Sequence, residues 1–143
     1  MTSVLVPPPA PPASTDQPIG RVVLIDPRPE RREIMSLVVD RSPKLTVVGL
    51  AASLEEADAL IRAEHADIAL VEIQMPVADG LAAVGTLRTA FPELRIVVCS
   101  FRFDSTTREN ARVAGADGYL TKPFRVEDLL VMLAALELHP PGA

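Results

Sequence analysis

Aromatic residues, cysteine and net positive charge are all scarce in this chain. Aromatics make up 3% of the 143 residues and tryptophan is absent, so a core must be built from aliphatic side chains. The single cysteine, Cys99, excludes an internal disulfide, which fits a reducing cytoplasm. A net charge of −5 without a long basic run argues against non-specific binding to nucleic acid or to anionic membranes.

Long apolar segments are also missing. No stretch approaches the roughly 20 apolar residues of a membrane-spanning helix, and the N-terminus lacks the basic and apolar regions of a signal peptide. Hydrophobic residues nevertheless make up 48% of the chain, enough for one folded domain with its own core. We therefore expect a single domain in the cytoplasm, with no membrane and no nucleic-acid partner.

Proline is concentrated at the N-terminus, where residues 1–20 contain six of them. We predict a disordered tail over this range with polyproline II character. The tail is either a solvated leader or a docking segment for a proline-binding partner. The predicted domain spans 21–138, and a short second tail covers 139–143.

Short apolar runs alternate with segments of helical length after the tail. Five runs are strand-like: Val22–Ile25, Leu45–Leu50, Ile68–Val71, Ile96–Cys99 and Tyr119–Leu120. The first four are nearly continuous and rich in β-branched residues, which is typical of strands covered on both faces. Such alternation predicts βαβ units around a parallel sheet, and hence an α/β fold.

Helix boundaries carry their own signals. Ser53 with Glu56 predicts a capping box, Pro29 suits the first turn of the first helix, and Asp104 is a candidate N-cap. The last helix should run from about Arg125 to Leu138. On the first helix we expect four side chains to cover the sheet: Ile34, Leu37, Val38 and the stem of Arg41.

Polar side chains follow four of the five strand-like runs. Asp26 follows the first, Glu72 the third and Ser100 the fourth, and the fifth leads to Lys122. Because the carboxyl ends of parallel strands meet at one edge of a sheet, these side chains should lie close together. Carboxylates suit a divalent cation, whereas a hydroxyl and an ammonium suit phosphoryl oxygens. Each alone would be an ordinary loop residue; together they predict a functional site.

Two stretches give the chain a family resemblance that covers about residues 20–138. Residues 67–76 (DIALVEIQMP), followed by Asp79-Gly80, and residues 114–124 (AGADGYLTKPF) resemble the receiver domains of two-component response regulators. The resemblance implies a flavodoxin-like (βα)5 fold, a doubly wound parallel sheet with strand order 2-1-3-4-5. It also implies a cis bond before Pro123.

Roles for particular residues follow from the resemblance. Glu72 stands at the phosphoacceptor position, which is normally Asp. Ser100 and Lys122 would be catalytic and would report phosphorylation, and Ser100 would form the switch with Tyr119. A Mg²⁺ site would use three ligands: Asp26, Glu72 and the backbone carbonyl of Gln74.

Two departures from the family pattern bear on this chemistry. Glu72 extends its carboxylate by one methylene, and a misplacement of about 1 Å can cost ~10²-fold in rate. Pro27 replaces a second acid and offers no side-chain ligand, so a Mg²⁺ site should be weak or absent and no cofactor is certain. We expect phosphorylation to be lost or much weakened and the chain not to be an enzyme, with residual phosphotransfer left open.

The pocket leaves two further pairs of alternatives open. Glu72 would either reach Lys122 and partly imitate the phosphorylated state, or form a plain ion pair that joins two strand ends. Three arginines that follow the first strand would either place a guanidinium near the pocket, in compensation for missing metal charge, or form a solvated helix face: Arg28, Arg31 and Arg32.

The last helix is more apolar than a surface helix needs to be. Leu129, Leu133 and Leu136 suffice to cover the sheet. Three further residues should face a neighbour, with Tyr119 nearby: Val131, Met132 and Ala135. An exposed apolar patch usually marks a partner site, and receivers commonly dimerise through the face of helix four, strand five and helix five. We predict a homodimer or a docked partner there; the alternative is that these side chains are singly tolerated on the surface.

Three functions compete. The leading one is a stand-alone bacterial receiver in two-component or phosphorelay signalling that acts by phosphorylation-independent protein contact, with the partner and any histidine kinase unnamed by the sequence. The second is a working receiver that passes on or hydrolyses a phosphoryl group, which needs metal despite Pro27. The third is a flavin or nucleotide binder, which is disfavoured because no glycine-rich phosphate loop follows the first strand.

Overall fold

The computed structural model describes residues 20–74, 80–102 and 104–138. Most of the predicted tail, the short tail at 139–143 and the Met75–Asp79 part of the first motif lie outside the described residues. Gly20, which we placed in the tail, is instead the buried first residue of a strand. No helix in the described part of the chain combines the length and apolar character that crossing a membrane requires.

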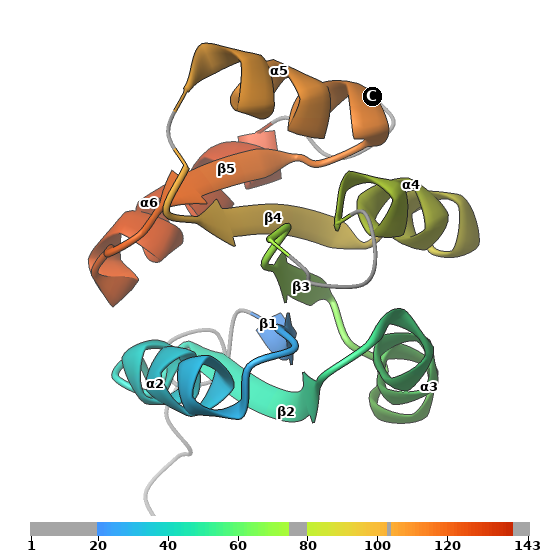
Figure 1. Ribbon diagram of the computed structural model, residues 1–143. Coiled ribbons are helices and arrows are strands. Elements are labelled where there is room, and N and C mark those ends of the chain that lie inside the picture. The colour runs from blue at the N-terminus through green and yellow to red at the C-terminus, as the bar shows by residue number, and fades with distance from the viewer. Residues whose placement is uncertain (1–19, 75–79, 103, 139–143) are drawn as a thin grey trace, which may run out of the picture.

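Strands and helices alternate along the described chain, as predicted (Figure 1). The elements are β1 (Gly20–Ile25), α2 (Pro29–Val39), β2 (Leu45–Ala51), α3 (Leu54–Glu64), β3 (Ile68–Val71), α4 (Gly80–Ala90), β4 (Arg95–Ser100), α5 (Ser105–Ala114), β5 (Gly118–Thr121) and α6 (Val126–Leu138). The five strands are parallel and have the order β2-β1-β3-β4-β5, which confirms the doubly wound, flavodoxin-like fold.

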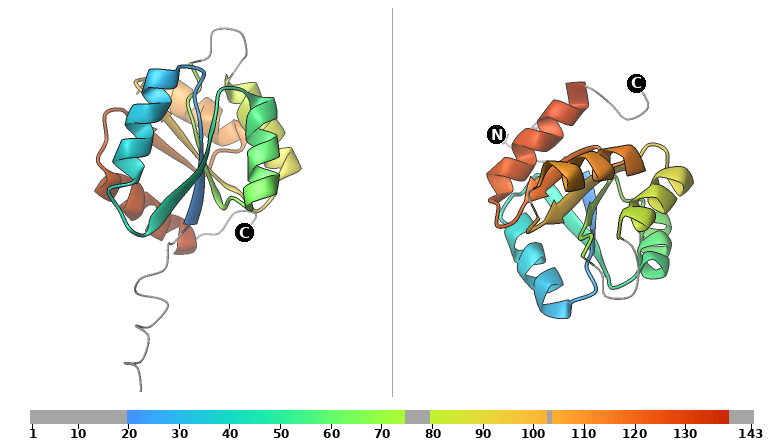
Figure 2. Two further views of the ribbon diagram at one scale, coloured as in Figure 1. Left: turned by 90° about the horizontal axis from the view of Figure 1, so that it is seen from below. Right: turned by 45° about the horizontal axis from the view of Figure 1, so that its top comes forward.

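Helices cover both faces of the sheet: α2 and α6 lie on one face, and α3, α4 and α5 on the other (Figure 1 and Figure 2). Successive residues of β1 serve opposite faces, because side chains alternate along a strand. Val23 and Ile25 pack in the cluster under α3, α4 and α5, whereas Val22 and Leu24 pack in the cluster under α2 and α6. The nearly continuous apolar run of this strand is therefore explained by burial on both sides.

The predicted helix boundaries are confirmed where their caps are described. The Ser53 side chain accepts a hydrogen bond from the Glu56 backbone N–H, and Pro29 stands in the first turn of α2. The Asp104 carboxylate accepts from the Thr107 N–H at 2.9 Å. These side chains satisfy backbone donors that the first turn of a helix leaves unpaired.

The predicted sheet-facing side of the first helix is wrong in part. Ile34 and Leu37 are 61% and 67% exposed. The side chains that pack on the sheet are Met35, Val38 and Val39. Arg32 lies on the same side of the helix as Met35 and Val39, which follow it by three and seven positions, and its guanidinium donates to the Asp26 carbonyl at 2.7 Å.

The surface of α6 agrees with the prediction at two of three positions. Val131 is 71% exposed and Ala135 is exposed, while Leu129 and Leu133 are buried. Met132 was expected to face a neighbour, but it is partly buried against the sheet. Gly118 of β5 makes room for it, since a Cβ at that glycine would lie 2.4 Å from the Met132 sulfur.

Arg88, near the C-terminal end of α4, connects segments that are distant in the sequence. Its Nε donates to the Gly115 carbonyl at 3.0 Å, and one Nη donates to the Leu94 carbonyl at 2.7 Å. The other Nη donates to the Asp117 carboxylate, which also accepts from the Ile96 N–H. A single guanidinium thus joins α4 to the start of β4 and to the turn between α5 and β5.

Candidate functional site

Four side chains were predicted to meet at the carboxyl edge of the sheet, here called the rim: Asp26, Glu72, Ser100 and Lys122. Three of them are in direct contact. Lys122 Nζ lies 3.1 Å from Glu72 Oε1 and 3.6 Å from Asp26 Oδ2. All three side chains are buried, with 2% of Glu72 exposed and 8% of the Lys122 side chain. Ser100 is buried beside them, but its hydroxyl accepts from the Arg102 N–H at 3.3 Å rather than meeting the ammonium. The Lys122–Pro123 bond is cis, as the resemblance implied.

Glu72 has both carboxylate oxygens engaged. Oε1 accepts from Lys122, and Oε2 accepts from the Gln74 N–H at 3.0 Å. A cavity of about 10 Å³ adjoins Glu72, Asp26 and Lys122. That volume is at most enough for one water molecule. The carboxylate is therefore held by its neighbours, and the cavity beside it is very small.

Asp26 has two oxygens in different situations. Oδ1 accepts from the Arg28 N–H at 2.9 Å and lies 3.6 Å from the Arg28 guanidinium. Oδ2 is buried without a hydrogen bond, although the Lys122 ammonium lies 3.6 Å away. A buried carboxylate in this position depends on the cations around it, because desolvation makes an unpaired charge costly.

The arginines that follow β1 lie closer to the pocket than a solvated helix face would. Arg28 Nη1 donates to the Gln74 carbonyl at 2.9 Å, and Arg32 donates to the Asp26 carbonyl. Arg31 instead lies with its guanidinium 5.4 Å from the centre of the Phe101 ring. Of the two alternatives, a guanidinium near the pocket is therefore the one observed for Arg28 and Arg32.

Phe101 was not identified from the sequence, although it follows the predicted Ser100 directly. The centre of its ring lies 5.6 Å from the Lys122 ammonium, and about half of the side chain is exposed. The ring is within reach of a cation–π interaction with the lysine. The position immediately after a site residue at a strand end was the signal that could have found it.

Tyr119, the predicted switch residue, lies on β5 and is partly buried. Its hydroxyl donates to the Arg102 carbonyl at 2.6 Å, and the Arg108 guanidinium lies 5.2 Å from the ring centre. Burial raises the pKa of the tyrosine hydroxyl, so it remains a hydrogen-bond donor at neutral pH. The ring is thus joined to the segment that leaves Ser100.

Cys99 is a core residue, as predicted, and carries no chemistry here. It is buried in the cluster under α2 and α6. Burial raises the pKa of its thiol to about 12, so the reactive thiolate is not formed at neutral pH.

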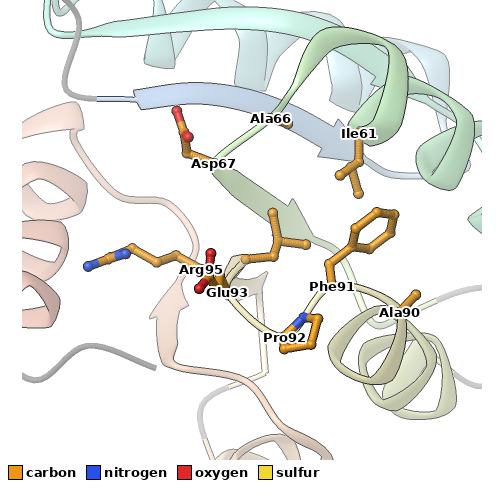
Figure 3. A pocket seen from close by; sticks show the side chains of 9 residues that line it. Ile61, Ala66, Asp67, Ala90, Phe91, Pro92, Glu93 and Arg95 are labelled. Carbon is orange, nitrogen blue, oxygen red and sulfur yellow. The ribbon is translucent and has the colours of Figure 1, made fainter. Parts of the chain in front are cut away.

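A larger cavity lies at the opposite ends of the strands and contains none of the predicted site residues. Its volume is about 750 Å³, and its lining comes from the end of α3, the end of α4 and the starts of β3 and β4. Figure 3 shows Ile61 and Phe91 pointing toward one another across it, with Asp67 and Arg95 further along the wall. The functional assignment therefore depends on the rim and not on this cavity.

Comparison with known proteins identifies the family. The model of the response regulator receiver domain family matches residues 22–134. The nitrate/nitrite response regulator NarL of Escherichia coli is 34% identical over 83% of this chain and 55% of its own length. The probable C4-dicarboxylate response regulator DctR of Halalkalibacterium halodurans is 31% identical over 85% of this chain and 53% of its own length.

Solved structures show the same fold. A two-component response regulator of the LuxR family from Aurantimonas sp. SI85-9A1 superimposes with a TM-score of 0.75 at 29% identity, covering 85% of this chain and 87% of that one. The chain spans about half the length of the curated relatives it matches. Together with the order of the parallel sheet, these matches show that the chain belongs to the receiver domain family of two-component response regulators.

Proposed function

We propose that this receiver acts by phosphorylation-independent contact with protein partners in two-component or phosphorelay signalling. The resemblance implies that position 72 is that of the phosphoacceptor, where this chain has Glu. The observation that carries the proposal is the buried Glu72–Lys122 pair, 3.1 Å apart beside a cavity of about 10 Å³. Here the ammonium that would contact a phosphoryl group is already paired.

The engaged carboxylate supports the proposal chemically. Attack on phosphorus depends on an oxygen positioned in line with the leaving group, and the hydrogen bonds to both oxygens of Glu72 fix its longer side chain on Lys122 and the Gln74 N–H instead. A phosphoryl group brings three acceptor oxygens and a charge of about −1.5 to −2. Glu72 supplies one negative charge in its place, so the chain would hold one state without a reaction.

One observation favours the second candidate, a phosphorylation-competent receiver. Asp26 Oδ2 is buried without a hydrogen bond, which leaves an acceptor available to an incoming cation. This candidate requires Lys122 to leave Glu72 and the cavity to open. A direct assay of phosphorylation separates the two candidates.

That assay is intact-mass analysis after incubation with Mg²⁺ and acetyl phosphate. We expect no added mass on the wild type and a phosphoryl adduct of ~80 Da on part of Glu72→Asp. The shorter Asp side chain leaves space in front of the carboxylate and loosens the contact with Lys122. Glu72→Gln has no nucleophilic carboxylate and is the control. A labile adduct on the wild type would reject the proposal in favour of the competent receiver.

The proposed partner surface is the face formed by α5, β5 and α6, with Tyr119, Val131, Met132 and Ala135 as its predicted contacts. Val131 and Ala135 are exposed on it. Tyr119 lies on the adjoining strand, and Met132 fills the space over Gly118 instead of projecting outward. We propose that a second copy of the chain or another protein docks here.

Val131→Glu tests this surface. If the chain dimerises through it, a charge buried there should weaken association at least about tenfold, because an unpaired buried charge is costly. Size-exclusion chromatography with light scattering over a concentration series measures the effect. Ile34→Glu on α2, equally apolar and similarly exposed, is the matched control. Equal dissociation constants for Val131→Glu and the wild type would place any interface elsewhere.

A further inference from the structure

The guanidinium of Arg28 lies between two oxygens that the resemblance implies as metal ligands. Its Nη1 donates to the Gln74 carbonyl at 2.9 Å and lies 3.6 Å from Asp26 Oδ1. The side chain is about one third exposed, so the group covers the rim from the solvent side. We infer that Arg28 is a built-in cation that takes the place of a divalent metal ion at this site.

The residues present do not fit Mg²⁺. The ion requires about six oxygens at roughly 2.1 Å in octahedral geometry. Here Arg28 occupies the Gln74 carbonyl, and Lys122 and the Gln74 N–H occupy the two oxygens of Glu72. Among the described residues no three acidic, histidine or cysteine side chains gather into a cluster that could hold a metal. An ion bound at both Gln74 O and Asp26 Oδ1 would collide with the guanidinium.

The local sequence explains how the guanidinium reaches this place. Pro27 removes a carboxylate that would otherwise face the rim. Arg28 stands between Pro27 and Pro29, and a residue before proline is restricted to extended backbone, which its φ of −96° and ψ of 115° confirm. Its N–H is held by Asp26 Oδ1, so the side chain starts next to the carboxylate it neutralises.

Charge balance supports the same conclusion. Among the described residues, the two buried carboxylates Asp26 and Glu72 pair with two cations, Arg28 and Lys122. The Arg32 guanidinium lies at the same site, so these carboxylates are already matched by positive charge and a divalent ion would add to an excess of it. Arg28 also joins the start of α2 to the segment after β3 without metal. The inference rests on the proposed function, because it takes this rim as the position of the family's phosphorylation site. It deepens that function by making the state of the rim independent of Mg²⁺.

Titration with MnCl2, followed by the relaxation of water protons, tests the inference. Mn²⁺ serves as the probe because it takes the same oxygen ligands as Mg²⁺. We expect no saturable binding by the wild type up to the highest MnCl2 concentration used. Arg28→Met should bind with a dissociation constant at least about tenfold below that concentration, because a unit positive charge next to the site is removed. Arg31→Met, which removes a guanidinium that lies on Phe101, should behave as the wild type does.

Each outcome is decisive. Saturable Mn²⁺ binding by the wild type, displaced by MgCl2, overturns the inference whether or not the variant folds. Unchanged binding in a folded Arg28→Met, checked by circular dichroism, overturns it as well; Arg28→Gln serves if the methionine variant does not fold. Metal binding by a wild type that gains no phosphoryl mass would reject this inference and leave the proposed function intact. A phosphoryl adduct on a wild type that binds no Mn²⁺ would do the reverse.

Discussion

Lys122→Met should lower the free energy of unfolding by about 3–5 kcal/mol, because it removes the shared partner of two buried carboxylates. Glu72 and Asp26 then keep like charges in a site with almost no solvent. Urea denaturation followed by circular dichroism measures the loss. Lys44→Met, which removes an exposed lysine, is the matched control and should change stability by no more than about 0.5 kcal/mol.

A double variant separates the ion pair from simple packing. In Glu72→Gln/Lys122→Met the negative charge beside the missing ammonium is also removed. The double variant should therefore be more stable than Lys122→Met alone. The two changes should therefore be non-additive by at least about 1 kcal/mol. If Lys122→Met costs no more than Lys44→Met, Lys122 does not hold these carboxylates and the proposed function loses its main support.

Arg88→Met should lower the free energy of unfolding by about 2–3 kcal/mol, because several polar groups lose their donor at once. The carbonyls of Gly115 and Leu94 and the carboxylate of Asp117 all bond this guanidinium. Arg112→Met breaks an exposed pair with Glu109 and should cost at most about 0.5 kcal/mol. Urea denaturation of both variants makes the comparison, and equal losses would show that Arg88 is an ordinary surface arginine.

Much of the fold was predictable because its signals are local. The central strands β1, β3 and β4 are almost wholly buried, and apolar runs mark all five strands within one or two residues. Contact of Glu72 and Lys122 was also predictable, although they are 50 positions apart, because the carboxyl ends of parallel strands meet at one edge. Sequence pattern and topology together are enough for such contacts.

Other features could not be predicted because the local sequence allows two orientations of a helix or side chain, and contacts with other elements decide between them. On α2 two neighbouring stripes are apolar, and the one that faces inward packs on residues of β1, β2 and α6, which are distant in the sequence or on other elements. Met132 faces inward because Gly118 provides space on another element. Arg88 and Arg28 donate hydrogen bonds mainly to backbone carbonyls. Every residue has such a carbonyl, so no pattern of side chains in the sequence predicts these contacts.

Sharing of β1 between the two cores constrains how this chain can vary. Alternate residues of that strand fill opposite sides of the sheet, and Asp26 follows its last residue directly. Loss of one residue inside β1 would exchange the two sets of side chains and also shift the carboxylate that pairs with Lys122. The length of β1 is therefore constrained both by the packing of its side chains and by the position of the Asp26 carboxylate. The exposed outer face of α2 has neither constraint and should tolerate substitutions.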